Sequence, residues 1–537
     1  MNAKKNNNTP IKKNDAEFPS DMEPIAVIDI GTNAVRLVVA ECRPQGRMRI
    51  LDSLEQSLRL GHDTFTTGEI SKDSIQECVE VLNSFRKILR EYGVVKNSQF
   101  RAVATSAVRE ANNQDAFLDR IYIATGINVE LLDNAEVNRF TYLSVLPLIS
   151  EKEKLKNAHT IILEVGAGSI EFLVLERGKV VLSQASRLGS LRMREMVENY
   201  GSSHDQMKAF MENQLNRRIM QFLNQMPRGK NLNIVAMGGD VRFAAAQIMP
   251  DWDRVSPVKL PVNKLKKFTY EILSLSVDDI VRRYPLQYVD AETIGPALLA
   301  YFQFARAFRV KKLHVVSTSM RDGVLTEMAV QDTWTEEFIS QVIHSTNELG
   351  RKYDNDEPHA VHVSDLAVQL FDALSDQHQL SSRYRLILRL AGLLHDIGFY
   401  INSRSHHKHS KYLIENSELF GLGMNYVRLI AYTSRYHRRA LPKSSHDIYE
   451  TMSRDFRIIA FKLASILRIA DALDRSHTQQ IRIHKAFVEE NTLVILLRPT
   501  ADIRMQEIAV KEKGDMFEQI FGMNVVLRTQ QKETVYG

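Results

Sequence analysis

Two short segments each place an acidic residue just before a turn that contains glycine. VIDIGTNAVRLVVAE, residues 27–41, aligns without a gap with ILEVGAGSIEFLVLE, residues 162–176. In each segment an apolar run carries an acid near its end, Asp29 or Glu164, and an alternating run follows the turn. Glycine lets backbone N–H groups approach an anion, and a carboxylate at a strand end can hold a hydrated cation. The pair therefore predicts a clamp for a phosphate group and its metal ion.

The turns themselves supply the candidate phosphate-binding residues. The alternative interpretation is a pair of ordinary β-hairpins with glycine turns. The same order of strand, acid, glycine turn and strand occurs twice in the chain, and this repetition favours the clamp. Two such turns facing each other would hold a phosphate from both sides. The first turn contributes Gly31, Thr32 and Asn33, and the second contributes Gly166, Gly168 and Ser169.

A second set of candidate ligands lies in the C-terminal half. LAGLLHDIGF places His395 and Asp396 side by side on an apolar helix, where burying both is costly unless they share a ligand or partner. His359 precedes this pair and Asp471 follows it. Imidazoles and carboxylates around one or two divalent ions support metal-dependent phosphate hydrolysis, because the ions lower the pKa of bound water. Further candidate ligands or substrate contacts are His406, His409 and His437.

Regular elements must position both sets. Up to about residue 330, apolar strands alternate with helix-like stretches, which predicts sheets covered by helices. Beyond it the periodicity is mostly helical, and the chain ends with a hairpin around Glu489, Glu490 and Asn491, the amphipathic helix IRMQEIAVKEKGDMFEQIF and a last strand. The predicted parts are a disordered tail (1–22), two α/β domains (23–147 and 148–330), a helical domain (331–478) and a small α+β cap (479–537) with a packing role.

Composition limits the protein class. The 537 residues exceed the size of one core, and 44% hydrophobic with 25% charged residues is ordinary for a globular protein. No apolar run reaches the roughly 18 residues that span a bilayer, and the polar N-terminal segment lacks the apolar core of a signal peptide. Two cysteines, Cys42 and Cys78, favour a reducing cytoplasm. A net charge of +5 fits an anionic substrate but not a dedicated nucleic-acid binder.

The chain resembles the Ppx/GppA family, exopolyphosphatases and guanosine pentaphosphate phosphohydrolases, over nearly its whole length after the tail. The resemblance implies two actin- or sugar-kinase-like (ribonuclease H-like) domains. In the cleft between them, glycine loops and Mg²⁺ or Mn²⁺ hold a terminal phosphoryl group while water attacks. It also implies a homodimer that binds polyphosphate or guanosine penta- or tetraphosphate. The matching segments, in order, are DIGTNAVRLVV, ATSAVREANN, LEVGAGSIEF, RLGSLR and AMGGDVRFAA.

The resemblance also assigns individual roles. Arg109 stands where the family has an arginine that contacts phosphate, and Glu171, Gly238 and Gly239 join the phosphate-binding residues. Asp29 would hold the metal ion together with Glu164.

The second loop departs from the family pattern. Glu164 replaces an aspartate, and Ala167 replaces the middle glycine of Asp-x-Gly-Gly-Gly-Ser. The extra methylene moves the carboxylate oxygens by more than about 1 Å, and Mg²⁺ tolerates little distortion. A shifted metal ion is therefore expected.

A further departure concerns the general base. LLDNAEVNRF matches the family segment Ser-Gly-x-Glu-Glu-Ala-Arg, whose second glutamate aligns the attacking water, and its position here is Val137. Valine cannot accept a proton, and loss of a base commonly removes about 10²–10⁴-fold in rate. Glu136 is the candidate substitute. A helical neighbour points about 100° away, so Glu136 would serve only if the helix start were rotated or unwound.

The C-terminal histidines carry a second resemblance. The order His359, His395-Asp396, Asp471 resembles the HD superfamily, whose helical domains hydrolyse phosphate esters. Within the Ppx/GppA family this domain is a frequent appendage that has often lost its ligands, and here all four remain. The alternative is a domain for dimerisation and for binding a long anionic chain, with a structural metal ion. In that case the basic residues Arg435, Arg438 and Arg439 would guide polyphosphate.

Three functional interpretations follow. The first is a cytoplasmic phosphoanhydride hydrolase that releases terminal phosphate from polyphosphate or guanosine pentaphosphate, with no nucleic-acid or membrane partner. The second, favoured by Val137, is a binding or sensing protein that captures such a ligand without turnover. The third places a metal-dependent phosphohydrolase reaction in the helical domain. The two substrates of the first interpretation are not separated, because both present a terminal phosphoryl group to the same loops.

Overall fold

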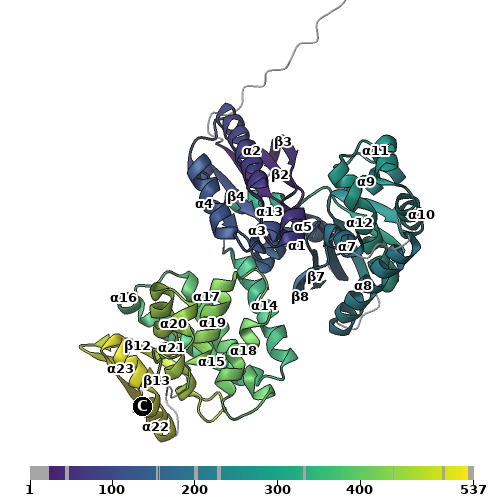
Figure 1. The fold of residues 1–537 in the computed structure, drawn as a ribbon. Helices are drawn as coiled ribbons and strands as arrows, with labels where there is room; N and C mark the ends of the chain where they lie inside the picture. Colours follow the sequence, from purple (N-terminus) through teal and green to yellow (C-terminus); the bar gives the residue numbers. More distant parts are fainter. Residues whose placement is uncertain are drawn as a thin grey trace, which may run out of the picture.

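The computed structural model describes residues 23–42, 48–152, 155, 158–198, 204–226, 232–330, 334–438, 441–498 and 502–529. The tail predicted over residues 1–22 lies outside the described residues, as does Arg439. Two α/β lobes lie side by side, a helical region lies below them, and a small three-stranded sheet lies on the side of the helical region away from the lobes (Figure 1).

The first lobe is built on a five-stranded sheet of order β3-β2-β1-β4-β5. Neighbouring residues of a strand point to opposite faces, so Ile28 packs under α2 and α4 while Val27 packs under α5 and α13. β1 and β2 form a hairpin in which Ile30 lies opposite Val35. The elements are β1 Pro24–Ile30, β2 Ala34–Cys42, β3 Met48–Ser57, α1 Leu60–Thr67, α2 Lys72–Glu91, η1 Asn97–Gln99, β4 Phe100–Ala104, α3 Ser106–Arg109, α4 Gln114–Thr125, β5 Val129–Leu131 and α5 Asn134–Glu151.

The second lobe repeats the plan on a six-stranded sheet of order β10-β11-β9-β6-β7-β8. β6 and β7 form the matching hairpin, with Val165 opposite Ile170, and β6 runs parallel to β9. The elements are β6 His159–Val165, β7 Ile170–Glu176, β8 Lys179–Ser186, α7 Ser190–Glu198, α8 His204–Gln225, β9 Leu232–Met237, α9 Gly239–Ile248, β10 Val258–Pro261, α10 Val262–Leu273, α11 Val277–Arg283, α12 Tyr288–Ala307, β11 Lys312–Val315 and α13 Met320–Val330.

Helix α13 follows the second lobe in sequence but packs on the first. Val324 shares a core with Val27 and Phe140, and Gly323 lies so close to α5 that a Cβ there would be 2.0 Å from the Phe140 carbonyl oxygen. Glu327 is buried, and its carboxylate is paired with arginines of β4 and α5. The chain therefore crosses back between the lobes and ties them together.

The helical region begins with α14, which leads down from the lobes (Figure 1). It also contacts the lobes through the connection between α18 and α19: Asp133 Oδ2 accepts a hydrogen bond from Met424 N at 2.6 Å, and the rings of Tyr142 and Phe420 pack edge to face. Its helices are α14 Glu336–Lys352, α15 Glu357–Ala373, α16 Ser375–His378, α17 Arg383–Leu394, η2 Ile397–Tyr400, α18 His406–Glu415, α19 Met424–Arg435, α20 Ile448–Thr451 and α21 Arg454–Leu473.

The C-terminal segment forms a sheet of order β12-β13-β14. β12 and β13 make a hairpin with Glu489 opposite Thr492, and β14 pairs parallel with β13. The single helix predicted here is wrong, because two helices meet at Gly514, where Arg468 Nε donates to the Lys513 carbonyl at 3.0 Å. None of the described helices is both long and apolar enough to cross a bilayer. The elements are β12 Ile483–Glu489, β13 Thr492–Leu497, α22 Arg504–Lys513, α23 Asp515–Phe521 and β14 Asn524–Thr529.

Candidate functional site

Both glycine turns are β-hairpin turns, and both line one cavity between the lobes. Gly31 N donates to the Ala34 carbonyl at 2.9 Å, and Gly166 N donates to the Ser169 carbonyl at 2.9 Å. The two interpretations given above, ordinary hairpins and a pair of facing turns, therefore do not exclude each other. Each turn belongs to a hairpin, and the two turns face each other across a cavity of about 330 Å³. We call this cavity the front cleft.

Ser106 joins the two turns. Its hydroxyl lies 3.2 Å from Thr32 Oγ1 of the first turn. A Cβ at Gly168 of the second turn would lie 2.2 Å from the same Ser106 Oγ, so any larger residue there requires the Ser106 side chain or the turn to move.

The front cleft collects almost all of the residues predicted for it. Glu136 is the exception: its Oε2 accepts from Asp133 N at 3.0 Å, and its own N donates to Asp133 Oδ1 at 3.0 Å, which is a capping box at the start of α5. Its neighbour Val137 lines the cleft instead. The predicted residues that line the cleft are Asp29, Gly31, Thr32, Asn33, Arg109, Glu164, Gly166, Gly168, Ser169, Glu171, Gly238 and Gly239.

The acids of the second turn are buried close together. Glu164 and Glu171 are paired across β6 and β7, and Glu171 is only 7% exposed. Burial raises the pKa of Glu164, and burial together with the neighbouring Glu164 raises the pKa of Glu171 to about 7. Ser169 Oγ donates to Glu171 Oε1 at 2.5 Å, and Thr141 Oγ1 donates to Glu164 Oε2 at 3.3 Å.

Arginines that the sequence analysis did not single out balance these acids. Arg321 Nη1 lies 3.0 Å from Asp29 Oδ2, and Arg36 and Arg242 also line the cleft beside Arg109. Arg109 is held by the Leu132 carbonyl at 2.5 Å and by Asn134 Oδ1 at 2.6 Å. The lining contains six carboxylates and four arginines, so a bound phosphate would need a further cation.

The internal repeat could have identified Arg36. In the gap-free alignment Arg36 takes the place of Glu171, and both lie opposite the acid of their own hairpin, Asp29 or Glu164. The sequence gives no comparable signal for Arg321, which comes from α13.

The third glycine segment begins a helix at the cleft wall. Gly238 has φ +116°, a conformation that favours glycine, and a Cβ there would lie 2.8 Å from the Tyr301 hydroxyl. Tyr301 donates to the Met237 carbonyl and accepts from Val165 N, so it fastens β9 to β6 at the cleft. Backbone N–H groups at the start of α9, with Gly239 in the lining, favour an anion.

The C-terminal candidates also come together. His359 Nε2 and His395 Nε2 lie 3.7 and 4.0 Å from Asp471 Oδ1 and 3.8 and 3.4 Å from Asp396 Oδ2. Asp396 Oδ1 faces the other way, toward the Nε2 atoms of His406 and His437 at 3.2 and 3.5 Å. We call this group the rear centre: His359, His395, Asp396, His406, His437 and Asp471.

The four histidines of the rear centre are oriented alike. His359 Nδ1 lies 2.8 Å from Asp474 Oδ2, and the Nδ1 atoms of the other three lie 2.6–3.2 Å from backbone carbonyl oxygens. Each Nδ1 can thus carry the proton, which leaves the Nε2 lone pair facing the centre. The Nε2 atoms of His359 and His395 have no hydrogen-bond partner among the described residues. Such a set of donors fits a divalent ion.

The pKa shifts of the residues in the rear centre also fit the binding of a divalent ion. Although burial opposes the shift, the neighbouring histidines lower the pKa of Asp396 well below its ordinary value. Burial lowers the pKa of His437, so its imidazole is neutral at pH 7. His477, which the sequence analysis did not single out, stacks on His359 with ring centroids 3.7 Å apart and could also reach an ion. Among the described residues, His409 joins none of these groups.

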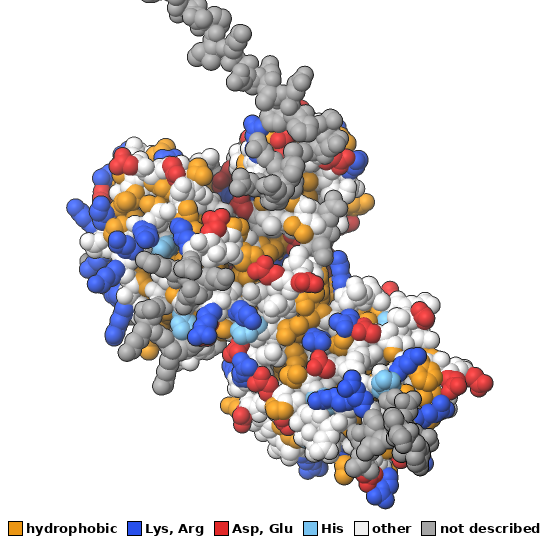
Figure 2. Space-filling view, turned by 180° about the vertical axis from the view of Figure 1, so that it is seen from behind, with side chains coloured by type: hydrophobic (Ala, Val, Ile, Leu, Met, Phe, Trp, Pro, Cys, Tyr) orange, Lys and Arg blue, Asp and Glu red, His pale blue; other side chains and the backbone are white. Residues whose placement is uncertain are grey.

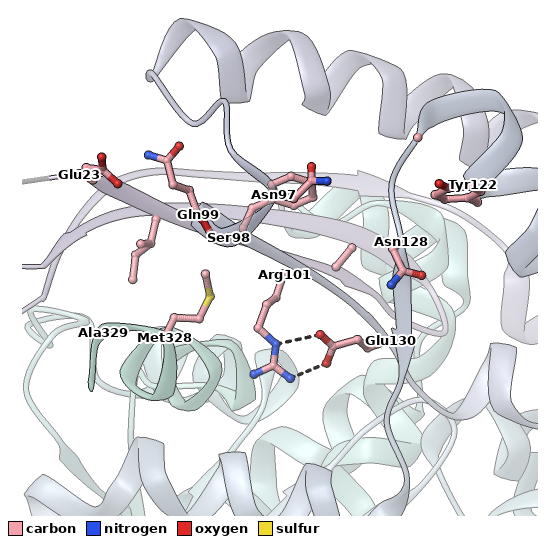
Figure 3. Close-up of a pocket in the computed structure, with 14 residues that line it drawn as sticks. Glu23, Asn97, Ser98, Gln99, Arg101, Tyr122, Asn128, Glu130, Met328 and Ala329 are labelled. Atoms are coloured by element: carbon pink, nitrogen blue, oxygen red, sulfur yellow. Dashed lines mark hydrogen bonds and ion pairs between the residues drawn. The ribbon is translucent and has the colours of Figure 1, made fainter. Parts of the chain in front are cut away.

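A larger hollow of about 1250 Å³ contains none of the predicted residues. Figure 3 shows it beside β4 and β5, with Nε and Nη2 of Arg101 turned toward the Glu130 carboxylate and with Met328 and Ala329 also in its lining. Arg101 is also paired with the buried Glu327, so its charge is taken up by two carboxylates.

The surface charge is mixed. Figure 2 shows Lys and Arg side chains interspersed with Asp and Glu on the face seen there. Both signs thus occur on this face, in keeping with the modest net charge of +5.

These features define a class: a two-lobed α/β protein with a polar cleft between its lobes and an appended helical region. Sequence comparison is more specific. The model of the Ppx/GppA phosphatase family matches residues 38–332, and that of Ppx/GppA phosphatase domain III matches residues 343–503. The chain belongs to the Ppx/GppA phosphatase family, as the sequence motifs predicted.

Individual relatives are distant. Proteins named guanosine-5'-triphosphate,3'-diphosphate pyrophosphatase from Photobacterium profundum and Aliivibrio fischeri are 22% and 23% identical. The alignments cover 91% and 89% of this chain and 95% and 92% of those proteins. The crystal structure of an exopolyphosphatase-like protein, 19% identical, covers 58% of this chain and 99% of its own with a TM-score of 0.52. That likeness supports the fold of the two lobes, the actin-like fold of the family.

Proposed function

We propose that the protein hydrolyses a terminal phosphoanhydride bond in the front cleft, with guanosine pentaphosphate or inorganic polyphosphate as substrate. The single observation that carries the proposal is that both acid-rooted hairpin turns line one cavity. Family membership supports phosphatase chemistry, and the names of the two relatives favour the guanosine nucleotide.

In this proposal the turns and the α9 N-terminus bind the terminal phosphoryl group, and Arg109 and Arg321 stabilise its charge. Asp29 and Glu164 would hold Mg²⁺ or Mn²⁺, and the excess of carboxylates in the lining fits such an ion. The ion would neutralise phosphate charge. With Cys78 buried as a thiol, the proposal places the reaction in the reducing cytoplasm.

A group inside the cleft must accept the proton of the attacking water. Glu136 is engaged in the capping box of α5, whereas Glu171 lines the cleft and has a pKa of about 7. We therefore propose Glu171 for this role. The test compares Glu171→Gln with Glu136→Gln, which keeps an acceptor for the cap. The first should reduce kcat about 10²–10⁴-fold and the second less than about threefold; the reverse order would return the role to Glu136.

The overall proposal is tested by phosphate release from polyphosphate and from guanosine pentaphosphate, each with Mg²⁺ and with Mn²⁺. Asp29→Ala should abolish release on the preferred substrate. Activity that persists unchanged in Asp29→Ala would remove the front cleft from the mechanism.

The rival is a receptor that binds the same ligands without turnover, and the observation in its favour is that Val137 lines the cleft where the family has a glutamate. Val137→Glu separates the two. A gain of about 10²-fold or more in the rate of hydrolysis would show that the native cleft is a receptor. An unchanged rate would show that another group already acts as the general base.

A second candidate activity, metal-dependent phosphohydrolysis, belongs to the rear centre, and the shared orientation of its four imidazoles favours it. His359, His395, Asp396 and Asp471 would hold a divalent ion, which lowers the pKa of bound water. Metal analysis of the native chain against His395→Ala and Asp396→Ala tests the proposal. Equal metal content in all three proteins would rule it out.

A further inference from the structure

Lys513 inserts a positive charge into the rear centre from outside the helical region. It is the last residue of α22, is 8% exposed, and its ammonium is hydrogen-bonded to Asp471 Oδ2. Arg468 of α21 also binds the segment that carries Lys513. Its Nε donates to the Lys513 carbonyl at 3.0 Å, and its Nη2 lies 2.5 Å from Asp515 Oδ1. α21 and the C-terminal helices thus hold Lys513 in place.

The two oxygens of Asp471 are divided. Oδ1 faces His359 and His395, while Oδ2 is taken by Lys513. The rear centre contains two carboxylates, Asp396 and Asp471, so the lysine neutralises one of them in the absence of any ion. A buried charge without a partner is costly, and Lys513 removes that cost for Asp471.

We propose that Lys513 is a resident counter-cation of the rear centre, which keeps the helical region stable without a divalent ion and weakens the binding of such an ion. The proposal rests on the metal centre proposed above. A divalent ion coordinated by Asp471 Oδ1 would lie close to the ammonium in a poorly solvated site, where like charges repel strongly. Ion occupancy therefore depends on whether the C-terminal sheet and its helices are docked.

The experiment uses the full chain after removal of metal by a chelator. Mn²⁺ is titrated by calorimetry into the native protein, Lys513→Met and Lys511→Met, and the melting temperature is measured with and without Mn²⁺. Lys511 is exposed on the same helix, so its variant is the matched control for loss of one lysine. His395→Ala in each background identifies the rear component and separates it from ions bound in the front cleft.

Lys513→Met should bind Mn²⁺ in the rear centre at least about tenfold more tightly than the native chain. Its ion-free form should melt at a lower temperature, and Mn²⁺ should raise that temperature by more than in the native protein. Lys511→Met should match the native protein in both measurements.

Unchanged or weaker Mn²⁺ affinity in Lys513→Met would overturn the role of Lys513 while leaving the metal centre intact. Absence of His395-dependent binding in both the native protein and Lys513→Met would overturn the metal centre and the inference together. Binding that appears only in Lys513→Met would support the inference in its strongest form.

Discussion

Glu171 and Arg36 show how the two halves of the front cleft differ at single residues. Each lies opposite the acid of its own hairpin: Arg36 faces Asp29, whereas Glu171 faces Glu164. The first hairpin thus places an arginine opposite its acid, with Arg36 ion-paired to Glu55 and Asp29 to Arg321, whereas the second places two acids opposite each other. Since two adjacent carboxylates resist simultaneous ionisation, the second hairpin depends on cations supplied by other elements.

The raised pKa of Glu171 predicts a pH-dependent difference in stability. The folded protein holds this proton up to about pH 7, whereas the unfolded chain releases it near the ordinary pKa of 4.5, so the contribution of Glu171 to stability falls as pH rises between these values. The full effect is about 3 kcal/mol. Thermal unfolding without metal ions should show Glu171→Gln gaining stability over the native protein between pH 4.5 and 8. A constant difference across that range would contradict the shifted pKa.

Asp474 acts on the rear centre without facing it. Its Oδ2 lies 2.8 Å from His359 Nδ1, so it fixes the ring and directs Nε2 toward the other ligands. Asp474→Asn keeps the shape but weakens this orientation, and Mn²⁺ affinity of the rear centre should fall about 10–100-fold. Asp365→Asn, at a half-buried position of α15 where the carboxylate pairs with Arg389, is the control and should bind as the native protein does. Equal affinity in both variants would show that Asp474 has no such role.

At the scale of elements, the hairpin turn of β6 and β7 is fixed by its contacts and not by its own backbone. Gly166 and Gly168 do not have positive φ, yet a Cβ at Gly168 would meet Ser106 of α3 at 2.2 Å, whereas a Cβ at Gly166 meets nothing closer than 3.4 Å. The requirement for glycine at 168 therefore comes from the opposite lobe.

Gly168→Ala should destabilise the protein by about 1–3 kcal/mol because the Ser106 side chain or the turn must move. Gly166→Ala, in the same turn, should cost less than half as much. The double variant Gly168→Ala, Ser106→Gly removes the obstructing hydroxyl and should recover most of the loss in thermal unfolding. Failure of the double variant to recover stability would locate the strain elsewhere.

At the scale of the whole molecule, one connection joins the two candidate sites. The segment 416–423 links α18, which begins at His406, to α19, which ends just before His437. It leads to Met424, whose N donates to Asp133 at the start of α5, and its Gly423 lies against the Glu136 side chain. Asn134, the first residue of α5, also holds Arg109 of the front cleft. The helical region that carries the rear centre thus contacts the start of α5, whose first residue also holds an arginine of the cleft.

Asp133→Asn tests the strength of this contact. Asparagine still caps α5, but its single oxygen cannot replace both carboxylate oxygens, so the hydrogen bond from Met424 N to the Asp133 carboxylate is lost. The melting temperature of the helical region should fall by about 2–4 °C for each kcal/mol lost, with about 1–3 kcal/mol expected. Asp115→Asn, exposed on α4, is the control. Identical calorimetric profiles for the two variants would show that the contact adds no stability.

Much of the local structure follows from the sequence alone. The repeat predicted two segments of strand, glycine turn and strand with an acid before each turn, and the spacing rule for helices predicted that Glu136 and Val137 would point in different directions. Both are properties of neighbouring residues, which the chain specifies through strand alternation and helix periodicity. The family motifs predicted the residues of the front cleft. They could do so because each motif is a short continuous segment of the chain.

What only the tertiary structure decided are the partners that come from distant segments. Arg321 reaches Asp29 because α13 crosses back to the first lobe, and Lys513 reaches Asp471 because the C-terminal helices pack on α21. Neither contact leaves a periodic or spacing signal, since the pairing energy of two charges depends on their separation and burial in the folded chain and not on their distance in sequence. The sequence supplies the reactive groups, and the fold sets the charge around them.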